Sequence, residues 1–327
     1  MSVQPSRRAF LSGKRFSVDP WLSFLAKLRA GAQGTLTLDP QFFESRAHWV
    51  PTTFNHIDAA RALCQQFGVI LCLQGLQASL DPKRKTLVVE PGQAWARPLP
   101  LDLQKGLWRF EAACTMQVLQ AAGVAAAKGA IPSQSLAHWF AYGTHHSIAL
   151  GGLAVLGIEN IEMMFGDGTI EVLGPFGAQN SEPLRSMFTQ RNMPQLFDVV
   201  RQSSLYALMQ PIDLDSSSAK VWPTDSFRID ALIDHAGGEP HLGQFFVGHG
   251  GRLGWLVAVT FLSVDQTTEV QKDRTKLNNK PSDYANLNTL LEFDKNEAEK
   301  KETVKKEVLK IDQSIKNIFD SPGVFLP

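Results

Sequence analysis

Apolar residues recur along the first third of the chain with the periods of helices and short strands. The apolar positions of 21–29 are spaced by three and four residues behind Asp19 and Pro20, which predicts a capped amphipathic helix. A second helix is predicted over 55–66, with Gly68 after its last turn. Strands are predicted over residues 35–38, 49–51, 69–73 and 86–90. Because the run 69–73 is wholly apolar, as in buried parallel strands, we expect a small βαβ unit here.

The middle of the chain mixes the two periods. Residues 108–122 place Phe110, Cys114 and Val118 on one helical face, so a helix is predicted there. Residues 155–173 alternate on both sides of Gly166-Asp167-Gly168, and Asp-Gly tolerates the backbone of a tight turn, so a hairpin is predicted. The pattern then predicts a helix over 187–208 that is interrupted at Pro194, and a strand or short helix over 222–233. Two apolar stretches flank a glycine cluster within 241–263.

The composition changes beyond Ser263, where lysine and glutamate become frequent and glycine nearly disappears. Apolar residues at helical spacing predict a helix over 297–318, which we expect to be a solvated appendage on a flexible linker. The predicted fold class is α+β. Residues 1–44 form an N-terminal arm with a short helix, and residues 45–97 a small βαβ subdomain. Residues 98–264 form a larger mixed-sheet subdomain, and residues 265–327 a charged tail that is partly helical or disordered.

Length, composition and charge limit the kinds of partner and compartment that the chain is expected to have. The chain has 327 residues, of which 44% are hydrophobic and 20% charged, as in soluble globular proteins. Its formal net charge is zero and no basic stretch is interleaved with aromatic residues, so we expect no nucleic-acid partner. No apolar run is long enough for a membrane span. The three cysteines, Cys64, Cys72 and Cys114, lack the spacing of zinc sites and are expected to be buried in a reducing compartment.

The N-terminus leaves two localisations open. Residues Ser6 to Leu11 contain Arg7-Arg8 and resemble a twin-arginine export signal, which would place the protein in the periplasm. Such a signal needs an apolar stretch next, whereas Ser12-Gly13-Lys14-Arg15 follows here. The cytoplasm is therefore the predicted compartment.

Residues 143–147, Gly-Thr-His-His-Ser, form the candidate ligand-binding segment. Glycine allows close approach of the backbone, and Thr144 and Ser147 add hydroxyl donors, which suits an anionic or heteroaromatic ligand. No metal is expected, because His145 and His146 point to opposite sides of an extended backbone and no third ligand is nearby. A Ser-His-Asp hydrolase is a weaker alternative, since the chain has no Gly-x-Ser-x-Gly elbow.

Four segments in order resemble the flavin-binding fold shared by vanillyl-alcohol oxidase, the sugar-lactone oxidases and the D-lactate dehydrogenases. Gly143–Ser147 is similar to the family's Gly-Thr-His-Gly-Ser, and Val155–Gly168 to the strand pair that follows it. Two weaker similarities are Leu87–Trp95, to a Val-Glu-Pro-Gly-Val-x-Trp motif, and Phe245–Val259, to a glycine-rich turn and strand. Together they cover roughly residues 48–263, and their occurrence in the family's order is the main support for the resemblance.

The resemblance implies a two-subdomain FAD-binding fold of the p-cresol methylhydroxylase type, with non-covalent FAD in the crevice between the subdomains. It implies an oxidoreductase that transfers hydride from an alcohol, lactone or hydroxy acid to the flavin and passes electrons to an acceptor or partner subunit; no catalytic residue is assigned. The residues at the family's cofactor-binding positions are Gly75, Gly143, Thr144, His145, Ser147, Gly151, Gly152, Gly248, Gly250 and Gly251.

The chain departs from the family pattern after Leu73. The glycine-rich phosphate loop is shortened there to Gly75, so fewer amides can converge on two phosphates. His146 and Ala137-His138 also replace glycines, and the family's large substrate-capping domain has no counterpart between Gly174 and Trp222. The alternative hypothesis is therefore a degenerate flavin-fold scaffold or electron-transfer subunit without catalysis of its own. A third is a reductase similar to the cell-wall enolpyruvyl-sugar reductase.

Overall fold

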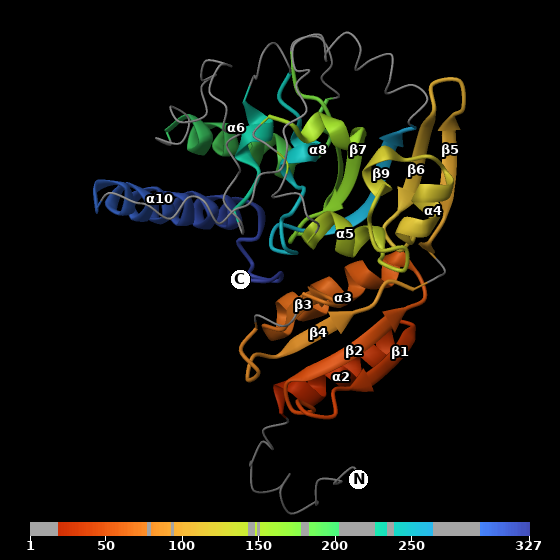
Figure 1. Cartoon of the computed structure of the whole chain (residues 1–327). Helices are drawn as coiled ribbons and strands as arrows, with labels where there is room; N and C mark the ends of the chain where they lie inside the picture. The colour runs from red at the N-terminus through yellow and green to blue at the C-terminus, as the bar shows by residue number, and fades with distance from the viewer. Residues whose placement is uncertain are drawn as a thin grey trace, which may run out of the picture.

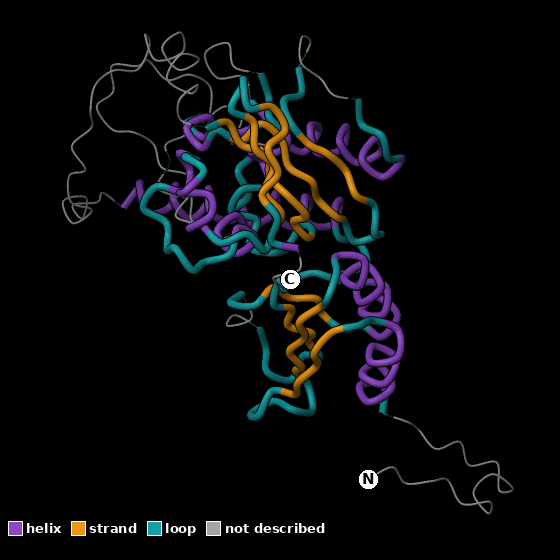
Figure 2. Tube along the Cα trace, turned by 90° about the vertical axis from the view of Figure 1, so that its right-hand side faces the viewer, coloured by secondary structure: helices purple, strands orange, loops and turns teal. Residues whose placement is uncertain are grey.

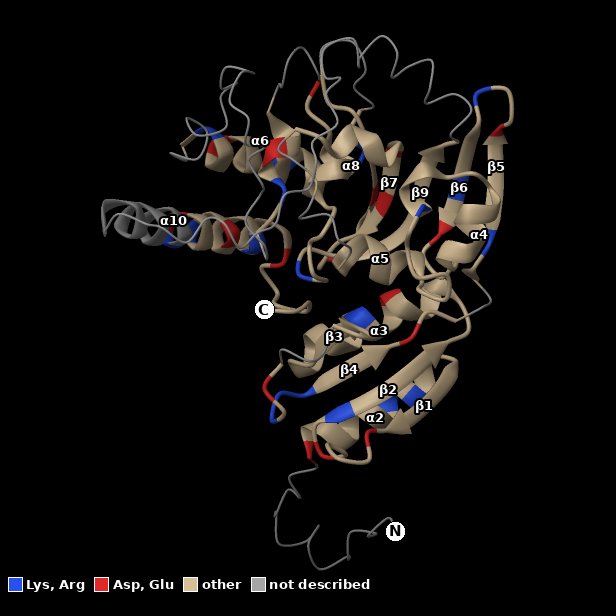
Figure 3. Ribbon diagram, in the orientation of Figure 1, with Lys and Arg blue, Asp and Glu red and all other residues tan. Residues whose placement is uncertain are grey.

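The chain is a mixed α and β protein built on two sheets, which lie one above the other in Figure 1. The computed structural model describes residues 19–76, 80–92, 95–142, 148, 151–177, 183–202, 226–233, 239–263 and 295–327, with the backbone alone for 295–305. The first sheet and its helices are called the small body, and the second sheet and its helices the large body. Figure 3 shows charged residues of both signs interspersed over both bodies. None of the described helices is long and apolar enough to cross a membrane.

The small body contains the predicted βαβ unit. Its sheet has the order β1-β2-β4-β3, in which β2, β4 and β3 are parallel and β1 is antiparallel to β2. The elements are α2 (Pro20–Gly31), β1 (Gly34–Leu38), β2 (Arg46–Pro51), α3 (Phe54–Phe67), β3 (Ile70–Leu73) and β4 (Thr86–Val89). Every residue of β3 is buried, so the wholly apolar run correctly predicted a buried parallel strand. The helix over 21–29 is also confirmed, with the Asp19 carboxylate accepting from the Trp21 amide.

The large body has a five-stranded sheet in the order β5-β6-β9-β7-β8. Its strands are β5 (Pro98–Asp102), β6 (Leu107–Glu111), β7 (Ile158–Met164), β8 (Ile170–Leu173) and β9 (Trp255–Leu262). All its pairs are antiparallel, so the predicted mixed sheet is wrong here, and the mixed sheet is the smaller one. The pattern predicts strands but not the direction in which strands distant in sequence pair. The hairpin of β7 and β8 is confirmed.

Two predictions for the middle of the chain are wrong. Residues 107–111 form β6 and not the start of a helix, because Trp108 and Phe110 face the core while Arg109 pairs with Glu162 on the other face of the sheet. The helix of this region, α4 (Met116–Ala121), starts later. Further on, α6 (Met187–Gln202) runs through Pro194 without a break, held by buried residues on both sides of the proline.

The remaining helical elements surround the large sheet. They are η3 (Ala125–Ala127), α5 (Leu136–Tyr142), η5 (Leu153–Leu156), η6 (Ile229–Leu232), α8 (Leu242–Phe245) and α10 (Lys295–Phe319). For the region 222–233 the sequence predicts a strand or short helix, and its described part, 226–233, contains the short 3₁₀ helix η6. The two stretches around the glycine cluster are α8 and β9.

The C-terminal helix is not a solvated appendage, while the expected flexible linker before it lies outside the described residues. The predicted helix is confirmed as α10, but Ile311, Ile315 and Phe319 on its apolar stripe are buried in the large body. The Asn192 side chain also donates to the Ile318 carbonyl oxygen at 3.0 Å, which ties α10 to α6. The many charged residues led to the expectation of a solvated helix, whereas Val308, Ile311, Ile315 and Phe319 of its described part face the core.

Arg61 on α3 connects the two bodies. Its guanidinium is buried, pairs with Asp58 at 2.8 Å and donates to the Gly166 carbonyl oxygen at 2.8 Å in the β7–β8 turn. The turn is thereby fixed against the small body. The end of α10 lies at the same place, because a side chain on Gly166 would lie 3.5 Å from the Phe319 carbonyl oxygen and 3.0 Å from the carboxylate of Asp320, the next residue. The bodies are packed together through polar as well as apolar contacts.

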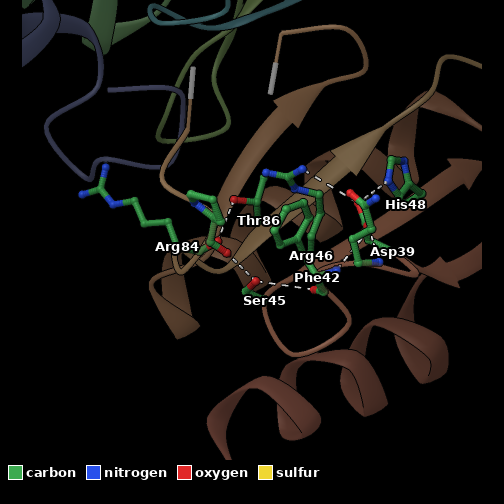
Figure 4. A network of polar contacts seen from close by, with 9 residues as sticks. Asp39, Phe42, Ser45, Arg46, His48, Arg84 and Thr86 are labelled. Carbon is green, nitrogen blue, oxygen red and sulfur yellow. Dashed lines mark hydrogen bonds and ion pairs between the residues drawn. The ribbon is translucent and has the colours of Figure 1, made fainter. Parts of the chain in front are cut away.

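A polar network at the outer side of the small body organises the connection between β1 and β2 (Figure 4). Asp39 accepts hydrogen bonds from the amides of Gln41 and Phe42, and its carboxylate lies 3.4 Å from His48 Nε2 and 3.8 Å from Arg46 Nη1. The Arg46 guanidinium also stacks over the Phe42 ring. Each of these groups has a partner that shapes the loop, so the network is structural.

Glu171 on β8 caps α6 from outside the helix. Its side chain is 2% exposed and accepts from the Ser186 amide at 2.8 Å, the Arg185 amide at 3.1 Å and the Thr189 hydroxyl at 2.7 Å. Burial raises the pKa of this carboxyl, but the hydrogen bonds outweigh burial and leave the pKa below its usual value. A helix N-terminus favours a carboxylate.

Acid is therefore expected to weaken the fold at Glu171. A carboxyl whose pKa is lowered by folding adds stability above its unfolded pKa, and this stability is lost as the pH falls through the folded pKa. Glu171→Gln should lower the unfolding free energy by about 1–3 kcal/mol at pH 7, as measured by urea unfolding. Between pH 5 and 3 the unfolding free energy of this variant should fall less than that of the wild type. Glu90→Gln, at an exposed position, is the control. Equal acid sensitivity in Glu171→Gln and the wild type would contradict the prediction.

Candidate functional site

The predicted cofactor-binding turns meet where the two bodies face each other. The turn after β3 contains Gly75 at φ +94°, and a side chain there would lie 2.7 Å from Nε2 of His138 on α5. Only glycine fits this approach. His138 is itself hydrogen-bonded to the Gln134 side chain, and burial lowers its pKa, so the ring is neutral at pH 7. The imidazole thus occupies the space beside Gly75.

The second glycine-rich turn packs on the end of α5. The amides of Gly248 and Gly250 donate to the carbonyl oxygens of Phe140 and Ala141 at 2.8 and 2.9 Å. These carbonyls belong to the last turn of α5, where the helix offers no amide partners of its own. The two predicted phosphate-binding amides therefore cap a helix in this structure.

Gly251 brings the two turns together. A side chain at Gly251 would lie 3.0 Å from Cδ1 of Leu76, which follows the Gly75 turn, and 3.3 Å from Cδ1 of Leu326 near the C-terminus. Both neighbours are buried and apolar. The two turns thus lie side by side, and the C-terminal segment, which the sequence does not predict at this place, lies beside Gly251.

A small cavity lies at this junction. It has a volume of about 20 Å³ and is lined in part by Leu71 and Leu73 of β3, by His249 and Trp255, and by Phe325. That is room for about one water molecule and none for a cofactor ring. Nδ1 of His249 and Nε1 of Trp255 are buried and have no hydrogen-bond partner among the described residues. Burial, followed by the charges of Arg252 and Lys316, lowers the pKa of His249 to about 3, so this imidazole is neutral.

The third predicted element is the segment that follows α5. Gly143, Thr144, His145 and Ser147 lie outside the described residues, so their predicted contacts stay predictions. Gly151 and Gly152 at its end are described, and Gly152 precedes η5. The Gly151 amide donates to Asp230 Oδ2 at 3.1 Å, so it too is engaged within the chain.

A buried ion pair that the sequence analysis did not predict bonds to the two described residues Ile148 and Gly151. Arg228 and Asp230 are fully buried and form two hydrogen bonds, Nε to Oδ1 at 2.8 Å and Nη2 to Oδ2 at 2.7 Å. Arg228 also reaches the Ile148 carbonyl oxygen at 3.4 Å. The signal in the sequence is an arginine and an aspartate inside the apolar stretch Phe227–Ile233, where charged residues need a partner.

The cysteines are confirmed as free, buried side chains. Burial raises the pKa of Cys72 to about 12 and that of Cys114 to about 11, and it raises the pKa of Cys64 further. Thiols in this state are poor nucleophiles. In the part of the chain that the structure describes, no three His, Cys, Asp or Glu side chains are grouped as metal ligands.

No protein-family model and no curated protein matches the sequence. Among solved structures, an alkyldihydroxyacetonephosphate synthase is similar over 76% of this chain and 42% of its own, with 11% identity and a TM-score of 0.41. A carbohydrate oxidase from Microdochium nivale, in complex with a substrate analogue, is similar over 73% of this chain and 42% of its own, with 13% identity and a TM-score of 0.39.

A third similar structure is the glucooligosaccharide oxidase from Acremonium strictum, which carries a 6-S-cysteinyl, 8α-N1-histidyl FAD. It is similar over 73% of this chain and 42% of its own, with 12% identity and a TM-score of 0.39. The chain thus spans less than half the length of each of these three proteins.

Proposed function

We propose that this chain is the FAD-binding unit of an FAD-linked oxidoreductase. The observation that carries the proposal is the convergence of two predicted cofactor turns on α5. The Gly75 turn contacts His138, the Gly248–Gly251 turn caps the helix, and the predicted flavin-binding segment 143–147 follows it directly. Ligands of mixed folds often bind where loops from two layers meet. FAD would supply the hydride chemistry, and the chain would hold it without a covalent bond.

The substrate and the electron acceptor belong to the proposal. An alcohol, lactone or hydroxy acid is the substrate class that the sequence resemblance implies. A partner subunit would supply surfaces that exclude water from the reacting atoms, since the family's substrate-capping domain has no counterpart between Gly174 and Trp222.

The described residues do not fit the phosphates of FAD as they are arranged here. The amides of Gly151, Gly248 and Gly250 are bonded within the chain. Leu76 and Leu326 lie against Gly251 where an anion would need polar donors. The proposal therefore requires a second arrangement of this crevice, and no reaction step is derived through the flavin.

The closed crevice favours a second candidate, a flavin-fold scaffold without a cofactor of its own. Such a protein would act by binding a partner. The specific observation is that buried apolar side chains, Phe325 and Leu326, occupy the place between β3 and the Gly248–Gly251 turn.

An absorption spectrum distinguishes the two candidates. The purified chain is expected to show visible flavin bands, or to acquire them after incubation with FAD and gel filtration, and acid precipitation should release the flavin into the supernatant. A colourless protein that fails to retain FAD would reject the oxidoreductase and leave the scaffold. Flavin that stays in the acid pellet would reject non-covalent binding.

A further inference from the structure

The small sheet ends in an open edge at β1, which is bonded on one side to β2. The Asp39 amide, just after β1, donates to the Arg46 carbonyl oxygen, so the odd-numbered residues of β1 direct their backbone groups toward β2. Gly34, Leu36 and Leu38 therefore direct their N–H and C=O groups away from the sheet. In the part of the chain that the structure describes, no backbone hydrogen bond reaches these outward groups.

The outer strands β5 and β3 are closed, in contrast to β1. Arg97, just before β5, directs its carbonyl oxygen to β6, so Pro98 and Pro100 take the outward positions, where they offer no N–H. At β3 the Leu71 amide donates to the Val324 carbonyl oxygen at 2.7 Å. The strand β1 has the sequence Gly-Thr-Leu-Thr-Leu, with neither a proline nor a charged residue. Such an unprotected edge is a template for pairing with another strand.

An apolar flank of α2 accompanies the open edge. The helices of the small body lie on one side of its sheet (Figure 2), and Lys27 Nζ of α2 lies 5.0 Å from the centre of the Phe67 ring of α3. Leu22 and Ala26 are exposed on the opposite flank of α2, which faces away from α3. Because α3 leads from β2 toward β3, this flank faces the β1 side of the sheet.

A second copy of the same strand suits this edge. A two-fold axis at Leu36 would pair Leu36 with its own copy and Gly34 with Leu38, each through reciprocal N–H to C=O hydrogen bonds. No like charges would meet, because the strand is uncharged. The 12 residues of α2 span about 18 Å and the 5 residues of β1 about 17 Å. Since a short turn joins the two elements, one axis passes near the middle of both.

The charges of α2 favour the same arrangement. Asp19 caps the N-terminus of the helix and Arg29 lies in its last turn, and both residues are exposed. An antiparallel second copy of α2 would bring Arg29 of each helix toward Asp19 of the other. Opposite charges would thus meet at both ends of the helix pair, which favours this orientation over a parallel one.

We propose that β1 and the Leu22–Ala26 flank of α2 form a homodimer surface, through which two copies join their small sheets into one continuous sheet. Pairing along one short strand buries little surface, so the α2 flank is a necessary part of the interface. β1 and β3 are the two outer strands of the small sheet, and the small cavity is lined from β3. The inference is therefore independent of the proposed function.

The test measures the oligomeric state of the full-length chain by sedimentation velocity over a range of concentrations. The wild type should dimerise, and Leu22→Glu should weaken the dimer at least about tenfold, because it places a charge in an apolar contact. Leu309→Glu is the matched control, because Leu309 on α10 is 59% exposed and Leu22 is 58% exposed. The control should leave dimerisation unchanged.

Hydrogen exchange of the Leu36 and Leu38 amides identifies the strand that pairs. Both amides should become protected as the wild-type concentration rises, and they should stay unprotected in Leu22→Glu at the same concentration. A wild-type chain that is monomeric at about 100 µM overturns the inference.

Two further results would also overturn it. A dimer that leaves these amides unprotected, or that the two glutamate variants weaken equally, is formed by another surface. Protection of the amides in a monomer would make a segment of the same chain the occupant of the edge.

Discussion

Phe319→Ala is expected to lower the free energy of unfolding by about 3–5 kcal/mol, the cost typical of emptying an aromatic site in a core. The Phe319 ring is fully buried at the end of α10. The centroid of its ring lies 5.5 Å from that of Phe165, 5.3 Å from that of Phe246 and 6.1 Å from that of Phe245. These three rings belong to the centre of the large body, so the cavity cannot be filled by a small shift.

Denaturant unfolding of the full chain measures this loss. Leu309→Ala on the same helix is the control, because Leu309 is 59% exposed and its truncation should change the free energy by no more than about 0.5 kcal/mol. Similar losses for Phe319→Ala and Leu309→Ala would show that α10 is not packed into the core. A loss confined to Phe319→Ala would establish the tail as part of the folded unit.

The contrast between these two positions also explains why the sequence misleads here. The apolar stripe of α10 was recognised, and the helix is confirmed. What periodicity cannot tell is whether a stripe faces a core or solvent when the surrounding residues are charged. That outcome depends on Phe165 and Phe246, which lie far away in sequence and offer a matching apolar surface.

Elements with purely local signals were predicted well. The β7–β8 hairpin was predicted from its Asp-Gly turn, and β3 from its unbroken apolar run. β6 was missed because Phe110 and Cys114 are also four residues apart, which imitates a helix. Its strand partner β9 lies some 150 residues later, where local pattern holds no information about pairing.

The candidate site was predicted only in outline. The sequence identifies glycines at turns, and the structure places the Gly75 and Gly251 turns side by side. It does not reveal which partners the amides of the Gly248–Gly251 turn take, since those are carbonyls of α5. It also gives no reason to expect the C-terminus or the Arg228–Asp230 pair nearby, because both contacts join distant parts of the chain.

Arg228→Met is expected to cost about 3–5 kcal/mol, because it removes the buried guanidinium that pairs with the buried Asp230 carboxylate. The double variant Arg228→Met with Asp230→Asn should be more stable than Arg228→Met alone, since the stranded charge is then removed. Arg109→Met is the control, because the Arg109–Glu162 pair is 22% and 24% exposed and should contribute no more than about 1 kcal/mol. The comparison needs the unfolding free energies of five chains: the wild type, Arg228→Met, Asp230→Asn, the double variant and Arg109→Met.

A double variant as unstable as the sum of its two single changes would contradict this account, because the cost would then lie in the shape of the two side chains and not in a stranded charge. The same pair also bonds to the backbone of Ile148 and Gly151, which follow the segment 143–147 in the sequence. Faster hydrogen exchange at Gly151 in Arg228→Met than in Arg109→Met would therefore link the ion pair to the backbone of the predicted flavin-binding segment. Equal exchange in the two variants would confine its role to the stability of the fold.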